Sequence, residues 1–202
     1  LRKRTNGGVR YCQYTSVLGL ARSSYFYHRA ALKAGDKYAT IRKMLTDITE
    51  FQLPAGKVWL SPVVDCFDGK VVSWSLSTRP DAELVNTMLD SAVETLNAGE
   101  RPVIHSDRGG HYRWPGWLER VNAAGLIRSM SRKGCSPDNA ACEGFFGRLK
   151  TEMYYGRKWS GITPEKFMQQ VDAYIRWYNE RRIKLSLGAV SPKMYRQQCG
   201  LE

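Results

Sequence analysis

Hydrophobic positions along the chain change their spacing from two residues to the helical period. Three early segments are rich in Val, Ile, Leu, Phe and Trp, a pattern typical of β-strands; they are residues 44–51, 57–67 and 70–77. Asp68-Gly69 between the second and third segments predicts a tight hairpin. Residues 81–99 instead repeat apolar positions at the helical period and end at Gly99, which predicts a helix.

The pattern then alternates between strand and helix. It predicts a strand over 101–106, a helix over 116–124, a short strand over 126–131 and mostly helix over 138–181. A strand that is reached through a helical crossover lies parallel to its partner in the sheet. We therefore expect an α/β fold, with a mixed five-stranded sheet flanked by helices, in which the first and fourth strands end side by side.

Charge divides the chain into two parts. The net charge is +12, and residues 1–43 hold ten Lys or Arg against one acid. This basic helical arm, which precedes an expected core domain over 44–202, is typical of segments that bind a polyanion, although a solvated tail has the same composition. Residues 17–32 fit a helix-turn-helix that presents Arg22 and Arg29 to DNA, and they fit a simple helical pair equally well.

Composition excludes several classes of protein. No apolar run is long enough to cross a bilayer and no signal-peptide pattern opens the chain, so we expect a cytoplasmic protein that acts away from membranes. Five cysteines, odd in number and scattered, argue against both a disulfide framework and a zinc site. The segment LPAGK lacks the first glycine of a phosphate-binding loop, so nucleotide hydrolysis has no support.

Two aspartates stand where the expected fold can bring them together. Asp47 lies within the first predicted strand, and Asp107 follows the fourth, just before Gly109 and Gly110. Asp and Gly are also ordinary turn residues, so neither aspartate alone indicates a site. Their importance depends on a third carboxylate.

The third carboxylate is on a helix that Ser136 and Pro137 are suited to begin. On this helix Asn139, Glu143, Gly147 and Lys150 follow at spacings of four, four and three residues, and so share one face. Glu143 fits an ordinary solvated helix residue. Gly144 and Gly147 are poor helix formers, however, each costing about 1 kcal/mol relative to Ala, which predicts close approach of another group.

Four motifs occur in order and carry a resemblance to a known family. They are TDIT at 46–49, HSDRGGHY at 105–112, SPDNAACEGFFGRLKTE at 136–152 and YIRWYNERRIKLSLGAVSPKMY at 174–195. Together they resemble the second-frame, OrfB-like transposase of bacterial insertion sequences, which has a retroviral-integrase-type core. Thirty-five residues separate Asp107 from Glu143, as in the DD(35)E group of that family.

The resemblance implies a ribonuclease-H-like fold and the chemistry of a DDE transposase. It implies that Asp47, Asp107 and Glu143 are catalytic and hold two Mg²⁺ ions, for which Mn²⁺ substitutes. Hard cations prefer carboxylate oxygens, and two such ions can stabilise both oxygens of a phosphodiester exchange. The implied reaction is DNA 3′-end cleavage and strand transfer during transposition, with DNA contacts from Lys150, Arg148 and Asn139.

The chain departs from the family pattern at one place. The long helical DNA-binding region that usually precedes the TDIT strand is missing, because DKYATIRK passes directly into MLTDITEF. A catalytically inactive DNA-binding remnant is therefore an alternative, and a nuclease that acts on RNA–DNA hybrids is a third. The partners implied are DNA, as element ends and target, an upstream-frame transposase protein, and further copies of the chain on DNA at the bacterial nucleoid.

Overall fold

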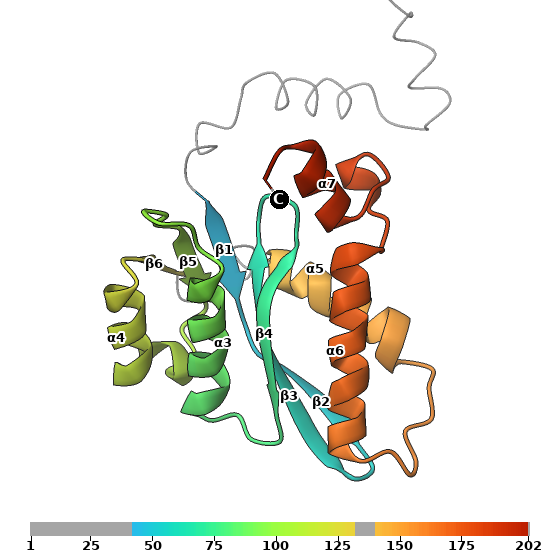
Figure 1. The fold of residues 1–202 in the computed structure, drawn as a ribbon. Helices are drawn as coiled ribbons and strands as arrows, with labels where there is room; N and C mark the ends of the chain where they lie inside the picture. Colours follow the sequence, from blue (N-terminus) through green and yellow to red (C-terminus); the bar gives the residue numbers. More distant parts are fainter. Residues whose placement is uncertain (1–41, 132–139, 202) are drawn as a thin grey trace, which may run out of the picture. The chain divides into compact units, whose positions relative to one another are not determined.

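The structure is a computed structural model that describes residues 42–131 and 140–201. Residues 1–41 of the predicted arm, including Arg22 and Arg29, lie outside the described residues, as do the helix start at Ser136 and Asn139. Figure 1 shows the arrangement of the helices and strands. In chain order they are β1 (Lys43–Thr46), β2 (Thr49–Leu53), β3 (Gly56–Asp65), β4 (Val71–Ser77), α3 (Ala82–Glu94), β5 (Val103–Ser106), the 3₁₀ turn η1 (Gly110–Arg113), α4 (Pro115–Ala123), β6 (Ile127–Met130), α5 (Ala140–Leu149), the π-helical turn η3 (Lys150–Tyr154), α6 (Pro164–Glu180), the 3₁₀ turn η4 (Leu185–Leu187) and α7 (Pro192–Gln198).

All six strands belong to one mixed sheet. The long strand β3 pairs antiparallel with β1 and β2 along one side and with β4 along the other. β5 pairs parallel with β1, and β6 pairs parallel with β5. The helical crossovers α3 and α4 produce these parallel pairs, so the expected side-by-side ends of the first and fourth strands are confirmed.

The sheet has six strands where five were expected, because the predicted strand 44–51 is interrupted after Thr46. The register does not shift: Met44 faces Asp65 and Thr49 faces Leu60, so the interruption sets Asp47 opposite Pro62. Cys66 N donates to Lys43 O (2.9 Å). In an antiparallel ladder such donors recur at every second residue, here 66, 64 and 62. The N–H of residue 62 would therefore be the donor to the carbonyl oxygen of Asp47. Proline has no N–H to donate, and the ladder breaks there.

Two hydrophobic clusters hold the helices on opposite faces of the sheet. Met44, Val63 and Ile104 pack with α3 and α4 on one face. Leu45 and Phe51, whose side chains alternate with Met44 along the chain, pack with α5 and α6 on the other. Figure 1 shows these two layers on either side of the strands. The α5 face is the one that the candidate site uses.

Local sequence explains where several helices begin. Asp81 accepts a hydrogen bond from Leu84 N at the start of α3 (3.2 Å). Thr163 and Ser191 cap α6 and α7 in the same way, each followed by proline at the first helical position. These caps satisfy N–H groups that have no partner within the helix.

A buried ionic network fixes α7 to the turn between β3 and β4. Arg196 donates to Asp68 Oδ2 (2.6 Å) and to Asp65 Oδ2 (2.8 Å). Arg42, which precedes β1, also donates to Asp65 Oδ2 (2.8 Å). The sequence DCFDG at 65–69 predicts that Asp65 is a hairpin residue rather than a metal ligand. The structure gives it a structural role at the hairpin, since it joins three segments of the chain.

The apolar patterns around four aromatic residues predict core positions for Trp114, Trp117, Trp177 and Tyr178. Trp117 and Tyr178 are fully buried, whereas Trp177 is 43% exposed and this expectation was wrong for it. The buried stripe of α6 runs through Phe167, Val171, Ile175 and Tyr178; Trp177 falls beside it. Among the described residues, no helix combines the length and the apolar character needed to cross a membrane.

Candidate active site

Asp47 and Asp107 follow the ends of two adjacent parallel strands. Leu45 faces His105 across β1 and β5, so two residues further on the same register sets Asp47 opposite Asp107. Side chains alternate along a strand, and Asp47 therefore lies on the same face as Leu45, the face covered by α5. The two aspartates therefore follow the same end of the paired strands β1 and β5.

Each aspartate is held by its own backbone. Asp47 Oδ1 accepts a hydrogen bond from Ile48 N (2.8 Å), and Asp107 Oδ1 accepts one from Gly109 N (2.8 Å). A Cβ atom added at Gly109 would lie 2.9 Å from Asp107 Oδ1, so the turn requires glycine to let the carboxylate fold back. An ionised carboxylate has about four acceptor positions on two oxygens, so the bond from Gly109 N leaves the Asp107 carboxylate with capacity for a cation.

Burial and the charge of Asp47 together raise the pKa of two groups, Tyr112 and Cys142. Burial, first, and then the negative charges of Asp47 and Asp107, among others, raise the pKa of the buried Tyr112 phenol. Burial, followed by the charges of Asp47, Cys66 and Glu143, raises the pKa of the Cys142 thiol on α5. Cys142, next to Glu143, also packs in one hydrophobic cluster with Leu45 of β1, so this part of α5 covers β1.

The three carboxylates are not gathered into a closed site. Glu143 and Asp107 are exposed, and Asp47 is half-buried. Among residues 42–131 and 140–201, no group of three or more His, Cys, Asp or Glu side chains is close enough to hold a metal ion. Hard carboxylate oxygens fit a divalent cation such as Mg²⁺ in chemistry. The parallel pairing of β1 with β5 sets the strand ends before Asp47 and Asp107 side by side, and α5, which bears Glu143, packs on the same sheet.

The glycines of α5 leave one surface open. A Cβ atom added at Gly147 meets no atom within 4 Å, and one at Gly144 meets only Arg148 Nη1, at 3.7 Å. The close approach that these glycines predicted is thus not made by any other element of the described chain. Within residues 42–131 and 140–201, the helix surface at Gly144 and Gly147 is therefore open.

Two predicted DNA contacts lie on α5 and its π-helical extension. Lys150 Nζ lies 5.6 Å from the centre of the Phe51 ring, on the side of the helix that faces β2. Arg148 is exposed and donates to Gly144 O (3.4 Å). Arg148 is therefore at the surface of the helix that bears Glu143, and Lys150, directly after the end of that helix, is half-exposed.

The two histidines that flank Asp107 have structural contacts. His105 is buried, and its ring nitrogens meet Ser129 Oγ (2.9 Å) and Ser131 Oγ (3.1 Å). His111 Nε2 meets Pro80 O (2.8 Å). For His105, at the end of an apolar strand, the sequence predicts mainly a packing role, and its burial confirms this prediction.

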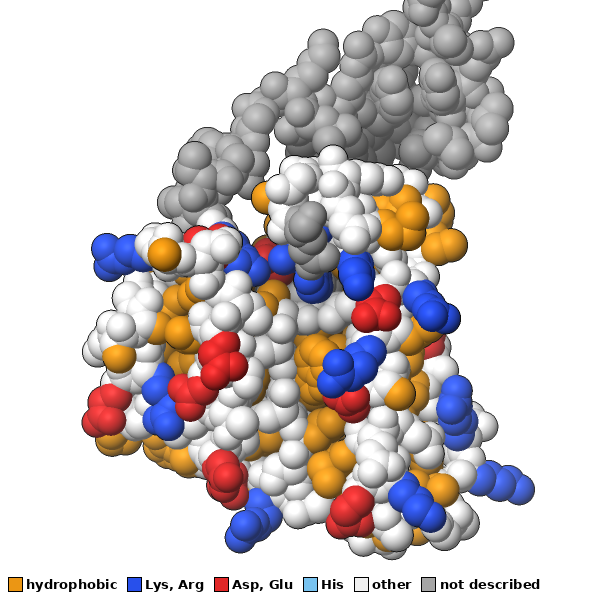
Figure 2. Space-filling view, in the orientation of Figure 1, with side chains coloured by type: hydrophobic (Ala, Val, Ile, Leu, Met, Phe, Trp, Pro, Cys, Tyr) orange, Lys and Arg blue, Asp and Glu red, His pale blue; other side chains and the backbone are white. Residues whose placement is uncertain are grey.

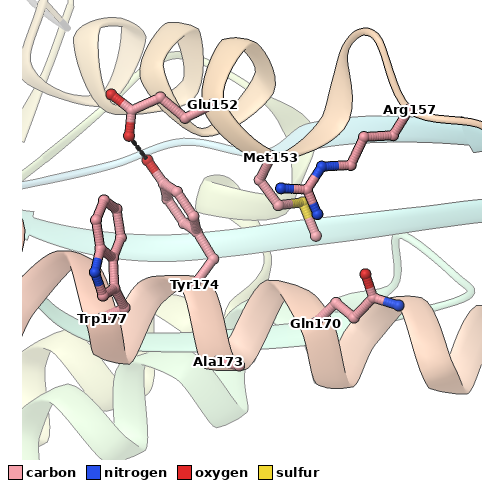
Figure 3. Close-up of a pocket in the computed structure, with 7 residues that line it drawn as sticks. All are labelled: Glu152, Met153, Arg157, Gln170, Ala173, Tyr174 and Trp177. Carbon is pink, nitrogen blue, oxygen red and sulfur yellow. Dashed lines mark hydrogen bonds between the residues drawn. The ribbon is translucent and has the colours of Figure 1, made fainter.

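A separate pocket lies between the π-helical turn η3 and helix α6. Its cavity volume is about 420 Å³, and its lining residues are Glu152, Met153, Arg157, Gln170, Ala173, Tyr174 and Trp177. Figure 3 shows Tyr174 rising from α6 to donate to Glu152, at 2.7 Å. Arg182 also donates to Glu152 (2.9 Å), and this hydrogen bond is the main cause of the lowered pKa of Glu152. The Glu152 carboxylate therefore joins η3 to Tyr174 of α6 and to Arg182, which follows α6.

Charge on the face formed by α3 and α6 is mixed. Figure 2 shows acidic and basic side chains interspersed there, with apolar side chains between the two helices. Exposed ion pairs such as Arg120 with Asp90 (2.8 Å) and Arg176 with Asp172 (2.8 Å) account for part of this pattern. This face does not present one continuous basic surface to a polyanion.

Sequence reasoning missed residues that shape the site without being acidic. Pro62 was included in a predicted strand, although proline inside an apolar strand is itself a signal of a broken ladder. Tyr112 and Thr46 were not singled out, since nothing in their spacing shows that they meet. Their contact is visible only in three dimensions.

Comparison with known proteins agrees with this architecture. The integrase core domain family matches residues 38–136, and a second integrase core domain family matches residues 143–199. An uncharacterised transposase-like protein of Haemophilus influenzae is 41% identical over 156 residues, which cover 77% of this chain and 71% of that protein. The chain belongs to the insertion-sequence transposases with an integrase-type core.

Other transposases are more similar but considerably longer. The probable transposase of element IS1353 from Shigella flexneri is 67% identical over 159 residues, which cover 79% of this chain and 31% of that protein. The putative transposase InsK of element IS150 from Escherichia coli is 46% identical over 156 residues, which cover 77% of this chain and 54% of that protein. The chain therefore spans about a third to a half of these two transposases.

Solved structures confirm the ribonuclease-H-like fold. A chain in the simian T-cell lymphotropic virus intasome, in complex with PP2A regulatory subunit B56 gamma, has a TM-score of 0.59 and 16% identity, covering 85% of this chain and 69% of that one. The HTLV-2 integrase catalytic core in complex with magnesium, in a trimeric form, has a TM-score of 0.57 and 15% identity, covering 75% of this chain and 94% of that one.

Proposed function

We propose that this transposase core catalyses divalent-metal-dependent cleavage of DNA and transfer of the resulting 3′ end to a second phosphodiester. The observation that carries the proposal is the parallel pairing of β1 with β5, the strands that Asp47 and Asp107 follow, in a sheet covered by the helix that bears Glu143. Membership of the transposase family and a fold shared with retroviral integrase cores support it.

The roles of the residues follow from their positions. Asp47, Asp107 and Glu143 would hold Mg²⁺ or Mn²⁺, two ions in all, and the ions when bound supply charge stabilisation for phosphodiester exchange. The backbone bonds from Ile48 and Gly109 pre-orient the two aspartates. A preformed anchor reduces the side-chain entropy lost on binding a cation, so these two turns favour assembly of the site.

DNA would enter along the open surface of α5. Gly144 and Gly147 leave room beside Glu143, and Arg148 and Lys150 supply positive charge for the phosphate backbone. Asn139, Arg22 and Arg29 are further proposed contacts. The DNA partners are the ends of a mobile element and a target, and the acting form is an oligomer on DNA in the bacterial cytoplasm, together with an upstream-frame protein.

A DNA-cleavage assay with a matched control tests this function. The substrate is duplex DNA that carries the sequences flanking the coding region, incubated with Mg²⁺. Asp107→Asn should reduce nicking and joining by at least about 100-fold, equivalent to about 2.7 kcal/mol. Asp90→Asn is the control, because it removes a carboxylate from an exposed ion pair on α3. Equal activity in the wild type and in Asp107→Asn rejects the proposal.

A second candidate function is DNA binding without cleavage. Two observations favour it: the three carboxylates do not form a group able to hold an ion among the described residues, and the chain spans only part of longer transposases. It predicts salt-sensitive retention of DNA and no cleavage with either Mg²⁺ or Mn²⁺. The same assay, read alongside a DNA-retention measurement, separates the two functions.

A further inference from the structure

Tyr112 is firmly attached to the turn that carries Asp107. It lies in η1, where its backbone N donates to Gly109 O (3.2 Å) and its carbonyl accepts from Arg128 Nη2 (3.3 Å). Gly109 N in turn donates to Asp107 Oδ1 (2.8 Å). The Tyr112 ring is 1% exposed and packs edge-on against Trp117, with ring centres 5.0 Å apart. Tyr112 therefore moves with the Asp107 turn.

The phenol of Tyr112 reaches the strand that carries Asp47. Its hydroxyl lies 3.4 Å from Thr46 Oγ1, and either oxygen can be the donor. Thr46 is fully buried and is the last residue of β1, directly before Asp47. A continuous series of contacts thus runs from Asp107 through Tyr112 and Thr46 to Asp47.

The contact lies on the opposite face of the sheet from the proposed cation. Tyr112 belongs to the cluster that packs with α3 and α4, and Thr46 alternates with Asp47, so its side chain points to that face. The Tyr112 hydroxyl is therefore buried in the hydrophobic cluster of that face. Its pKa is raised by burial and by the charges of both aspartates, which keeps it a neutral hydrogen-bonding group near both.

We propose that the Tyr112–Thr46 contact sets the separation of Asp47 and Asp107 and so increases the affinity of the site for a divalent cation. This inference rests on the proposed metal-dependent function. Tyr112 and Thr46 are positioning residues rather than catalytic residues. Groups that orient metal ligands from outside the coordination sphere commonly change metal affinity by about 10- to 100-fold.

Mn²⁺ binding to the full chain, measured by titration calorimetry without DNA, tests the inference. Tyr112→Phe keeps the packed ring and removes the hydroxyl; Thr46→Val keeps the branched shape and removes the partner. We expect each variant to weaken the Kd for Mn²⁺ by roughly 10-fold. The double variant should be no weaker than either single variant, because both changes break one contact. Thr46→Ser, which restores a hydroxyl, should bind nearly as tightly as the wild type.

Tyr154→Phe is the matched control. Its hydroxyl donates to Gln52 O (2.6 Å), a link between η3 and β2 that does not join the two aspartates. This variant should lower Tm and leave the Kd unchanged. If Tyr112→Phe also lowers Tm but keeps the wild-type Kd, or if the two single effects add fully in the double variant, the inference is overturned.

Failure of the inference and failure of the proposed function give different results. Binding that is lost in Asp107→Asn and retained in Tyr112→Phe rejects the positioning role alone. A wild-type chain that binds no Mn²⁺ rejects both the metal site and the positioning role.

Discussion

Replacement of Arg196 by alanine is predicted to destabilise the core strongly. The guanidinium joins α7 to Asp65 and Asp68, through bonds of 2.8 and 2.6 Å. The side chain of Arg196 is 11% exposed, and those of Asp65 and Asp68 are 2% and 0% exposed. Alanine would leave two buried carboxylates without this partner, although Asp65 keeps its bond from Arg42.

The expected loss is about 3–5 kcal/mol of unfolding free energy, the usual cost of removing one member of a buried ion pair. In a unit of this size each 1 kcal/mol lowers Tm by about 2–4 °C, so Tm should fall by about 6–20 °C. Urea unfolding at pH 7 measures the free energy directly. Combining Arg196→Met with Asp68→Asn should recover part of the loss, because no unpaired charge then remains at Asp68.

Arg120→Ala is the control for this experiment. Arg120 pairs with Asp90 at 2.8 Å, but the two side chains are 38% and 52% exposed, and an exposed pair contributes about 1 kcal/mol at most. If Arg196→Ala costs no more than Arg120→Ala, the buried network does not hold α7 and the reasoning is refuted.

Three further predictions concern the site and its supports. Gly109→Ala should reduce cleavage and Mn²⁺ affinity together, because the added Cβ would lie 2.9 Å from Asp107 Oδ1; unchanged affinity would show that the turn tolerates a side chain. Pro62→Val should supply the missing ladder donor, so the new amide should exchange slowly with deuterium, and rapid exchange would contradict the account of the strand break. Arg182 lowers the pKa of Glu152 below its ordinary value of 4.5. This pair therefore stabilises the fold above pH 4.5, and the contribution is lost as the pH falls through the lowered pKa. Glu152→Gln should make the unfolding free energy depend less on pH in this acidic range, and an unchanged dependence would exclude the contribution.

Much of the fold follows from sequence patterns because each strand and helix carries the apolar periodicity of its own structure. Alternating apolar residues mark the strands, and the helical period of 81–99 covers α3, which ends earlier, at Glu94. The crossover rule also predicts, without any coordinates, the parallel pairing of the strands that precede Asp47 and Asp107. The exposure of Trp177 was within reach of the same method, since it lies two residues from Ile175 on a stripe that continues at Tyr178.

Other features depend on residues far apart in the chain. The sequence indicates only a hairpin residue at Asp65, because its partner Arg196 is 131 residues away in the chain. The meeting of Tyr112 with Thr46, across 66 residues, likewise leaves no trace in spacing or composition. Such contacts need the packed tertiary structure, whereas strands and helices need only their own periodicity.

The central claim is that Asp47, Asp107 and Glu143 form one site for divalent cations. Anomalous diffraction from crystals soaked in Mn²⁺ tests it most directly. The account predicts manganese density bound by oxygens of Asp47 and Asp107, with Glu143 drawn in to complete the site. Manganese bound elsewhere, with the two aspartates lacking any ion at saturating concentration, would contradict it.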